Sequence, residues 1–230
     1  MCKPTRSAFT LAEVLITLGI IGVVASMTIP SLINSFQEKA YITAFEENYS
    51  LLSQAYTLAA QENGTADNWS SDWSSTEVRN NFSPYLKVLK DCNTYCTRTT
   101  AVKDLKGGSI GGFTSYHLIL ANGAFLYFTN GLADFNLVLD TNGEQKPNTL
   151  GYDVFMLKAT ARSGAPFIGW ATYNEINEGW VKNNGDSQSC RFSSDWASPN
   201  WWDGGGCAYW LITHHNMDYL HRVIPNSEWK

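Results

Sequence analysis

The chain has 230 residues, of which 44% are hydrophobic and 16% charged, and its formal net charge at pH 7 is −5. An acidic chain is a poor candidate for general binding to nucleic acid or to anionic lipid, because both partners are negatively charged. Once a stretch of membrane length is set aside, the remaining residues suit one domain of ordinary size.

The N-terminus contains the stretch around which the chain is organised. Residues 9–29 read FTLAEVLITLGIIGVVASMTI and contain one charged residue, Glu13. A helix of this length spans about 30 Å, the hydrocarbon thickness of a bilayer. The leader before it carries Lys3 and Arg6, which predicts a cytoplasmic N-terminus and an exported remainder. Removal of the leader leaves 14 basic and 21 acidic residues, a net charge of −7.

Glu13 is the anomaly in this apolar stretch. An ionised carboxylate inside a bilayer costs at least about 2.5 kcal/mol, so it should have a partner or a function. Three simpler alternatives explain the stretch less well. A conventional signal peptide has a shorter apolar region without Glu, a plain membrane anchor gives no reason for Glu13, and a buried core helix needs no basic flank.

Residues 6–25, RSAFTLAEVLITLGIIGVVA, resemble the N-terminal signature of type IV pilins and of type II secretion pseudopilins. The resemblance implies that a prepilin peptidase cuts between Ala8 and Phe9 and methylates the new amine of Phe9; the family usually has Gly where this chain has Ala8. It also implies that Glu13 pairs with that amine on a neighbouring subunit. A buried carboxylate and a buried ammonium are each costly alone and tolerable together, so the pairing favours assembly and selects a register.

A second helical half is predicted after Pro30, whose ring disrupts the hydrogen bonding of the preceding turn. Family helices bend or locally melt at this proline during packing. Apolar residues then recur at helical spacing, which predicts a face that packs on a globular head: Phe45, Tyr49, Leu52, Tyr56 and Ala59. Asn63-Gly64 is a natural stop, so the long helix should run from Phe9 to Glu62. The predicted divisions are a leader (1–8), a membrane or filament-core helix (9–30) and a head (31–230), of which residues 31–62 are the amphipathic half of the helix.

The head is predicted to be α+β. Ser74-x-x-Glu77 is a capping-box pattern, which predicts a short helix with Val78, Phe82, Leu86 and Leu89 on one face, although Pro84 lies within it. Strands are expected at 116–120 and 124–128 around the turn Ala121-Asn122-Gly123, and then at 135–139 and 152–160. Short turns between consecutive strands predict an antiparallel meander. A long N-terminal helix followed by such a meander is also the pilin fold that the resemblance implies.

Five cysteines are present, and Cys2 leaves with the leader. The other four allow three pairings in an oxidising compartment, of which we favour the local one, Cys92–Cys96 and Cys190–Cys207. Pilins often fasten a C-terminal loop in this way, so the resemblance supports the second pair. The alternative is a four-cysteine zinc site, whose usual spacing only Cys92 and Cys96 satisfy.

Residues 140–153 are the best ligand candidate. Asp140, Asn142 and Asp153 offer hard oxygens, and Gly143 permits a tight turn, which together suit calcium. Major pseudopilins hold calcium in a loop of their C-terminal region, although the resemblance to that loop is loose. The alternative, which we favour, is an ordinary strand connection with Asn-Gly and Pro-Asn as turn formers. No cofactor is otherwise required.

Other residues carry weaker signals. Trp201-Trp202, among nine tryptophans, suits either a sugar-binding or adhesive surface or simple packing. His214, His215 and His221 have few carboxylates near them in the sequence that could help bind a metal, and no nucleophile–base pattern or phosphate loop suggests an enzyme.

The sequence therefore predicts a single-pass inner-membrane protein that polymerises with itself or other pilin-like subunits, with a prepilin peptidase and an assembly platform as partners. The alternative function is a membrane-tethered adhesin or carbohydrate-binding protein that never polymerises.

Overall fold

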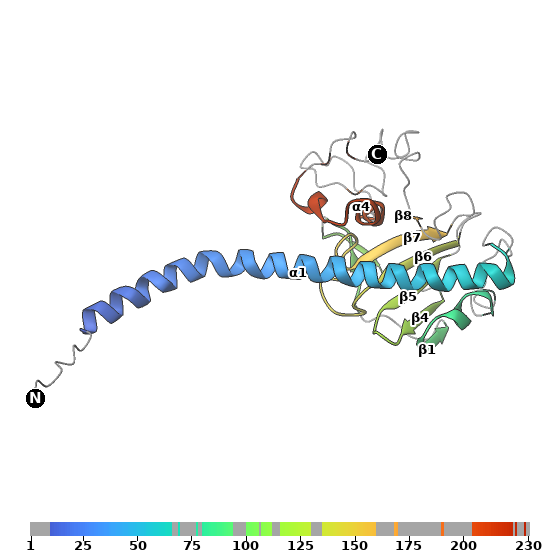
Figure 1. Ribbon diagram of the computed structural model, residues 1–230, viewed down its shortest axis with the longest axis horizontal. Coiled ribbons are helices and arrows are strands. Elements are labelled where there is room, and N and C mark those ends of the chain that lie inside the picture. The colour runs from blue at the N-terminus through green and yellow to red at the C-terminus, as the bar shows by residue number, and fades with distance from the viewer. Residues whose placement is uncertain are drawn as a thin grey trace, which may run out of the picture. The chain divides into compact units, whose positions relative to one another are not determined.

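The structure is a computed structural model of the chain (Figure 1). It describes residues 10–65, 69, 77, 80–93, 100–105, 107–111, 116–129, 135–159, 168–169, 190, 204–222, 224 and 228. The chain divides into two compact units, Met1–Ala40 and Tyr41–Lys230, and each is described by itself.

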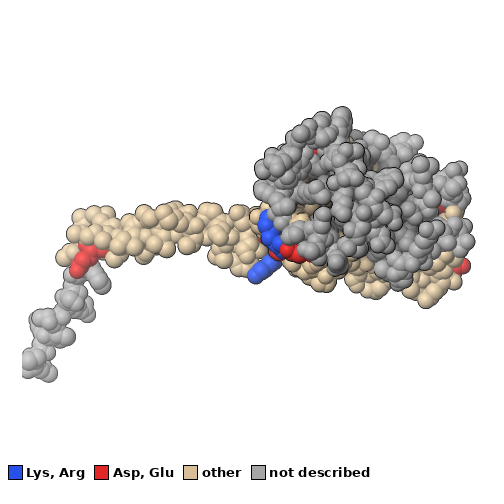
Figure 2. All heavy atoms as spheres, turned by 90° about the horizontal axis from the view of Figure 1, so that it is seen from above, with Lys and Arg blue, Asp and Glu red and all other residues tan. Residues whose placement is uncertain are grey.

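The first unit consists, in its described part, of the beginning of helix α1 (Leu11–Asn63). Residues 14–37 include no charged side chain, and Figure 2 shows this segment as an uncharged surface. Its large apolar side chains are exposed from Leu11 to Phe36. Among the described residues, α1 is the one helix long and apolar enough to cross a membrane, by length and composition. The predicted long helix is confirmed, and it ends before Gly64, whose φ of 77° suits glycine.

The second unit contains a six-stranded sheet in the order β1-β4-β5-β6-β7-β8, in which all neighbours are antiparallel. The strands are β1 (Val88–Asn93), β4 (His117–Leu120), β5 (Phe125–Thr129), β6 (Phe135–Asp140), β7 (Val154–Ala159) and β8 (Ile168–Gly169). The predicted hairpin around Asn122 is β4–β5, and the predicted meander is β4 to β7, so both are confirmed. A separate two-stranded sheet pairs β2 (Val102–Lys103) with β3 (Ser109–Gly111).

The two faces of the sheet bury different partners because side chains alternate along each strand. On β7, Phe155 and Leu157 point into the larger core, whereas Val154 and Met156 point into the smaller one. The second half of α1 and the C-terminal elements, α4 (Cys207–His214) and the 3₁₀ turn η3 (Asp218–Leu220), cover the larger core (Figure 1). Val102 of β2 lies in the smaller core.

The helix predicted to run from Ser74 to Leu89 is wrong in its second half. Glu77, Asn80 and Asn81 are helical, but the chain then forms a 3₁₀ turn, η2 (Ser83–Tyr85), and enters β1 at Val88. Pro84 has no backbone N–H to continue an α-helix. Leu89 is accordingly 69% exposed on an edge strand instead of lying on a buried helical face.

Candidate functional site

Glu13 is held within its own chain at the start of α1. Its Oε2 accepts hydrogen bonds from the backbone N–H of Thr10 at 2.9 Å and from the Thr10 hydroxyl at 2.8 Å. The same hydroxyl accepts a hydrogen bond from the Glu13 N–H at 3.2 Å, which completes a reciprocal capping box. The sequence-based predictions miss Thr10, although the spacing Thr10-x-x-Glu13 carries the same signature as Ser74-x-x-Glu77.

The hydroxyls further along the apolar half of α1 are satisfied by the helix itself. Thr17 donates to the carbonyl of Glu13 at 2.9 Å, Ser26 to that of Val23 at 2.8 Å, and Thr28 to that of Val24 at 3.0 Å. Such bonds let hydroxyls lie in hydrocarbon without water. Pro30 lies inside α1, and the helix continues beyond it. Ala8 and Phe9 lie outside the described residues, so the cleavage site stays a prediction.

Asp153 organises the connection between β6 and β7. Its side chain is fully buried, and its two oxygens accept the backbone N–H groups of Asn148 at 2.9 Å and Thr149 at 2.7 Å. The Asn142 side chain bonds to the same carboxylate. Burial raises the pKa of Asp153, and these N–H donors partly offset that rise. A carboxylate that receives several N–H groups fixes the path of the loop around it.

The three predicted calcium ligands do lie together. Asn142 bonds to Asp153 through its side chain, and its backbone N–H donates to Oδ1 of buried Asp140 at 3.3 Å. Calcium needs six to eight oxygens, but no group of three or more His, Cys, Asp or Glu side chains gathers within the described part of the chain. Both Asp153 oxygens accept N–H groups, which favours a structural connection. The Asn142 Oδ1, in contrast, is buried and accepts no hydrogen bond from described residues. Calcium therefore stays a prediction.

The predicted disulfide between Cys190 and Cys207 is confirmed. The two Cα atoms are 4.6 Å apart, and both residues are buried. Because these sulfurs are joined, they have no thiolates to offer, and the alternative four-cysteine zinc site is wrong. Cys92 is also disulfide-bonded. Its predicted partner, Cys96, lies outside the described residues, so that pairing stays a prediction.

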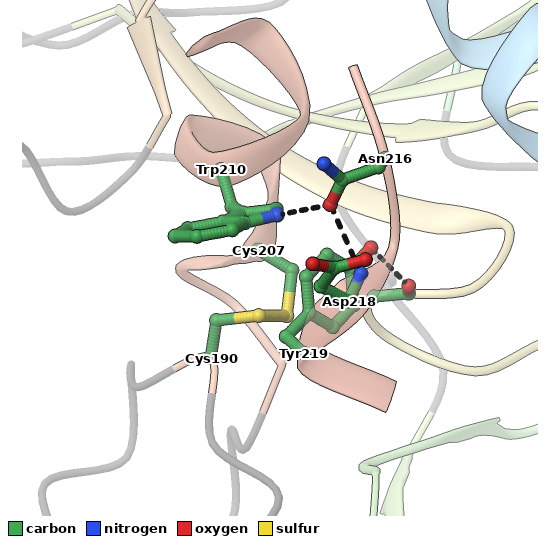
Figure 3. The surroundings of a disulfide bond; sticks show 7 residues. Cys190, Cys207, Trp210, Asn216, Asp218 and Tyr219 are labelled. Carbon is green, nitrogen blue, oxygen red and sulfur yellow. Dashed lines mark hydrogen bonds between the residues drawn. A yellow bond between two sulfur atoms is a disulfide. The ribbon is translucent and has the colours of Figure 1, made fainter. Parts of the chain in front are cut away.

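The C-terminal segment after the disulfide rests closely on the β6–β7 connection (Figure 3). The Tyr219 hydroxyl, which is fully buried, donates to the carbonyl of Gly151 at 2.7 Å. A Cβ atom at Gly151 would lie 2.9 Å from Sγ of Cys207, and one at Gly204 would lie 2.6 Å from the carbonyl oxygen of Leu150. Both glycines also have positive φ angles, so no other residue suits these two close approaches.

Side-chain hydrogen bonds and ring stacking order the turn after α4. The Trp210 ring donates to Oδ1 of Asn216 at 2.8 Å, and the Asp218 N–H donates to the same oxygen at 3.1 Å (Figure 3). The His214 ring stacks on Trp210 with centroids 3.7 Å apart, and Nδ1 of His215 lies 2.7 Å from a carboxylate oxygen of Glu46. His214 and His215, which the sequence makes poor metal ligands, therefore contact Trp210 and Glu46 instead. Trp201 and Trp202 lie outside the described residues, so the adhesive interpretation stays untested.

A long apolar N-terminal helix, an antiparallel sheet and a disulfide near the C-terminus together define an α+β fold of the pilin-like kind. A family model, the prokaryotic N-terminal methylation motif, matches residues 3–29. No curated protein and no solved structure matches the chain. The chain therefore carries a prepilin-type leader and is a precursor similar to type IV pilins and pseudopilins. The motif points to a structural subunit rather than an enzyme.

Proposed function

We propose that the mature protein is a subunit of a type IV pilus or of a type II secretion pseudopilus. The observation that carries this proposal is the methylation motif at residues 3–29, which covers the start of a helix whose next 24 residues, 14–37, are uncharged. A prepilin peptidase would cut between Ala8 and Phe9 and methylate Phe9. The subunit would then pass from the inner membrane, by way of an assembly platform, into a filament.

In this proposal each predicted division of the chain has one task. Residues 1–8 are the cytoplasmic leader, residues 9–30 cross the membrane once and later pack in the filament core, and residues 31–230 form the exported head. The partners are other copies of the chain or related subunits. Contacts that repeat head to tail without closing generate an open helical filament.

The geometry at Glu13 suggests how one carboxylate serves before and after assembly. Both hydrogen bonds from Thr10 go to Oε2, and Oε1 accepts none from the described residues. Oε1 can therefore receive the N-methylated amine of a neighbouring subunit while the capping box at Oε2 persists. Burial of an unpaired carboxylate is costly, so this pairing would favour the correctly packed filament.

Processing and assembly are tested separately. Mass spectrometry of the mature protein should find Phe9 at the N-terminus and one methyl group on its amine. Glu13→Ala should insert and be cleaved normally but give few filaments in a shearing assay, because it removes the acceptor and makes membrane residence easier. Glu38→Ala, which removes a carboxylate of α1 beyond the apolar segment, is the matched control and should assemble. Incorporation of Glu13→Ala at the wild-type level would contradict the pairing, whereas absence of the wild-type protein itself from the sheared filaments would favour the tethered adhesin.

A further inference from the structure

One polar side chain interrupts the buried face of α1. The helix residues buried in the second unit are five apolar or aromatic residues and one amide: Phe45, Asn48, Leu52, Ala55, Tyr56 and Ala59. Asn48 is 2% exposed and lies amid this apolar seam. A buried amide must find hydrogen-bond partners, so its surroundings are informative.

Asn48 reaches the turn of the β4–β5 hairpin. Its Nδ2 donates to the carbonyl of Ala44 one turn back at 2.8 Å, and its Oδ1 accepts a hydrogen bond from Nδ2 of Asn122 at 2.9 Å. The Oδ1 of Asn122 in turn accepts the N–H of Ala124 at 3.2 Å. The turn is closed by the Gly123 N–H, which donates to the Leu120 carbonyl at 3.0 Å. The hairpin therefore presents the Asn122 amide to the helix in a defined position.

The apolar pattern of α1 does not by itself define where the helix lies on the sheet. A shift of four residues in one direction puts Tyr49, Leu52, Tyr56, Ala59 and Ala60 in the places of Phe45, Asn48, Leu52, Ala55 and Tyr56. These incoming residues are all apolar or aromatic, and only the place of Ala59 receives a polar residue, Asn63 at the helix end. A shift the other way brings Tyr41, Ala44, Leu51 and Leu52 to buried places, with Asn48 in the place of Leu52. Either way, a shifted helix still buries a largely apolar face.

Both shifts separate the two amides. The first leaves Asn122 facing Leu52, and the second buries Asn48 away from Asn122. The second shift leaves Asn48 buried without its partner, which disfavours that placement by roughly tenfold or more. The first shift loses the hydrogen bond to Asn122, whose side chain is exposed, and puts the Asn63 amide in the fully buried place of Ala59, which also disfavours it. A single polar residue in an apolar seam selects register in the same way in coiled coils.

We propose that the Asn48–Asn122 pair is a register lock, which selects one placement of the second half of α1 on the sheet. Each four-residue shift would move the sheet about 6 Å along the helix axis. The lock acts within one chain and so goes beyond the proposed filament function. Its consequence for assembly, that subunits present their heads at one position along α1, rests on that function.

An intrachain cross-link reports the register. The rings of Tyr41 on α1 and Tyr152 before β7 have centroids 6.4 Å apart, and both residues are partly exposed. Tyr41→Cys with Tyr152→Cys, in the full chain exported so that its native cysteines are oxidised, should be joined nearly completely by a short bismaleimide. Mass spectrometry measures the yield, and because the link forms within one chain, the result does not depend on filament formation.

The decisive variant adds Asn48→Leu and Asn122→Ala to this cysteine pair. Replacing both amides leaves neither amide without its partner, and its other loss is the 3.2 Å hydrogen bond from the Ala124 N–H at the hairpin turn, so the melting temperature should fall by no more than a few degrees. The cross-link yield should nevertheless fall to half or less, because the chain now occupies several registers. A yield equal to that of the parent would overturn the register lock.

Two further variants separate register from stability. Leu52→Ala keeps the amide pair and loses buried apolar surface, so it should melt lower and still cross-link fully. Asn122→Ala alone leaves Asn48 buried without its partner, which favours the shift that carries Asn48 out of the seam. Its yield should fall at least as far as that of the double replacement, and it provides the test if the double replacement does not fold. Full yield from Asn122→Ala would also overturn the proposal.

Discussion

Removal of the Cys190–Cys207 disulfide should lower the stability of the head by a predictable amount. The two residues are 17 positions apart, and closing a ring of that size restricts the unfolded chain by about 3 kcal/mol at 25 °C. For a unit of the size of Tyr41–Lys230, each 1 kcal/mol shifts the melting temperature by about 2–4 °C. Cys190→Ala with Cys207→Ala should therefore melt about 6–12 °C lower. Alanine is chosen over serine because both sites are buried and a hydroxyl there would add its own cost.

The fold itself should survive this change. The Tyr219 hydroxyl can still donate its hydrogen bond to the Gly151 carbonyl, and Gly204 can still pack closely against Leu150. The C-terminal segment should therefore stay packed on the β6–β7 connection. Circular dichroism of the full chain in detergent, under non-reducing conditions, measures both the secondary structure and the melting temperature. Replacement of Cys92 by alanine in a separate variant shows the effect of the other disulfide. A fall of less than about 2 °C for the double variant, or a peptide map that joins Cys190 to Cys92, would refute the reasoning.

Three other predictions concern Thr10, Asp153 and calcium. Thr10→Val removes the capping hydroxyl, so hydrogen exchange of the backbone amides in the first turn of α1 should become several-fold faster. Thr10→Ser keeps the hydroxyl and should exchange like the wild type. Equal exchange rates in all three proteins would argue against the capping box. The pKa of Asp153 is raised by folding, so its protonation adds stability that is fully present below about pH 3.8 and is lost as the pH rises through the folded-state pKa. The stability difference between wild type and Asp153→Asn should therefore fall from pH 4 to pH 7, and a difference that grows with pH would contradict the burial argument. The hydrogen bonds to Asp153 predict the same melting temperature in millimolar calcium and in chelator; a higher value in calcium that Asp140→Ala abolishes would instead establish the metal site.

Some features of this protein could be predicted from the sequence because their causes lie within a few residues of one another. The apolar run after Phe9 and the Asn63-Gly64 stop define α1, and the Ala121-Asn122-Gly123 turn defines the β4–β5 hairpin. The prepilin-type motif is equally local, which is why residues 3–29 alone carry it. Local backbone preferences and hydrophobic periodicity decide these elements before any long-range contact forms.

The chain after Pro84 shows where such reasoning fails. Phe82 and Leu86 are buried as the helical pattern predicts, but Leu89 is exposed on β1. Pairing with β4, a strand that begins 24 residues after β1 ends, decided the conformation of this segment. Strand pairing depends on which distant segment is available, so it overrides a weak local preference.

The sequence by itself determined a membrane-length helix with a prepilin leader and an antiparallel head, because apolar length, charge placement and turn residues are local properties. Only the tertiary structure decided what the polar residues of the head do. Asp153 attracts attention in the sequence as a metal ligand, yet folding surrounds it with the N–H groups of Asn148 and Thr149. Asn48 is inconspicuous in the sequence, yet folding buries it against Asn122, 74 residues away. A polar group has the role that its partners give it, and partners far along the chain are brought to it only by the packed core.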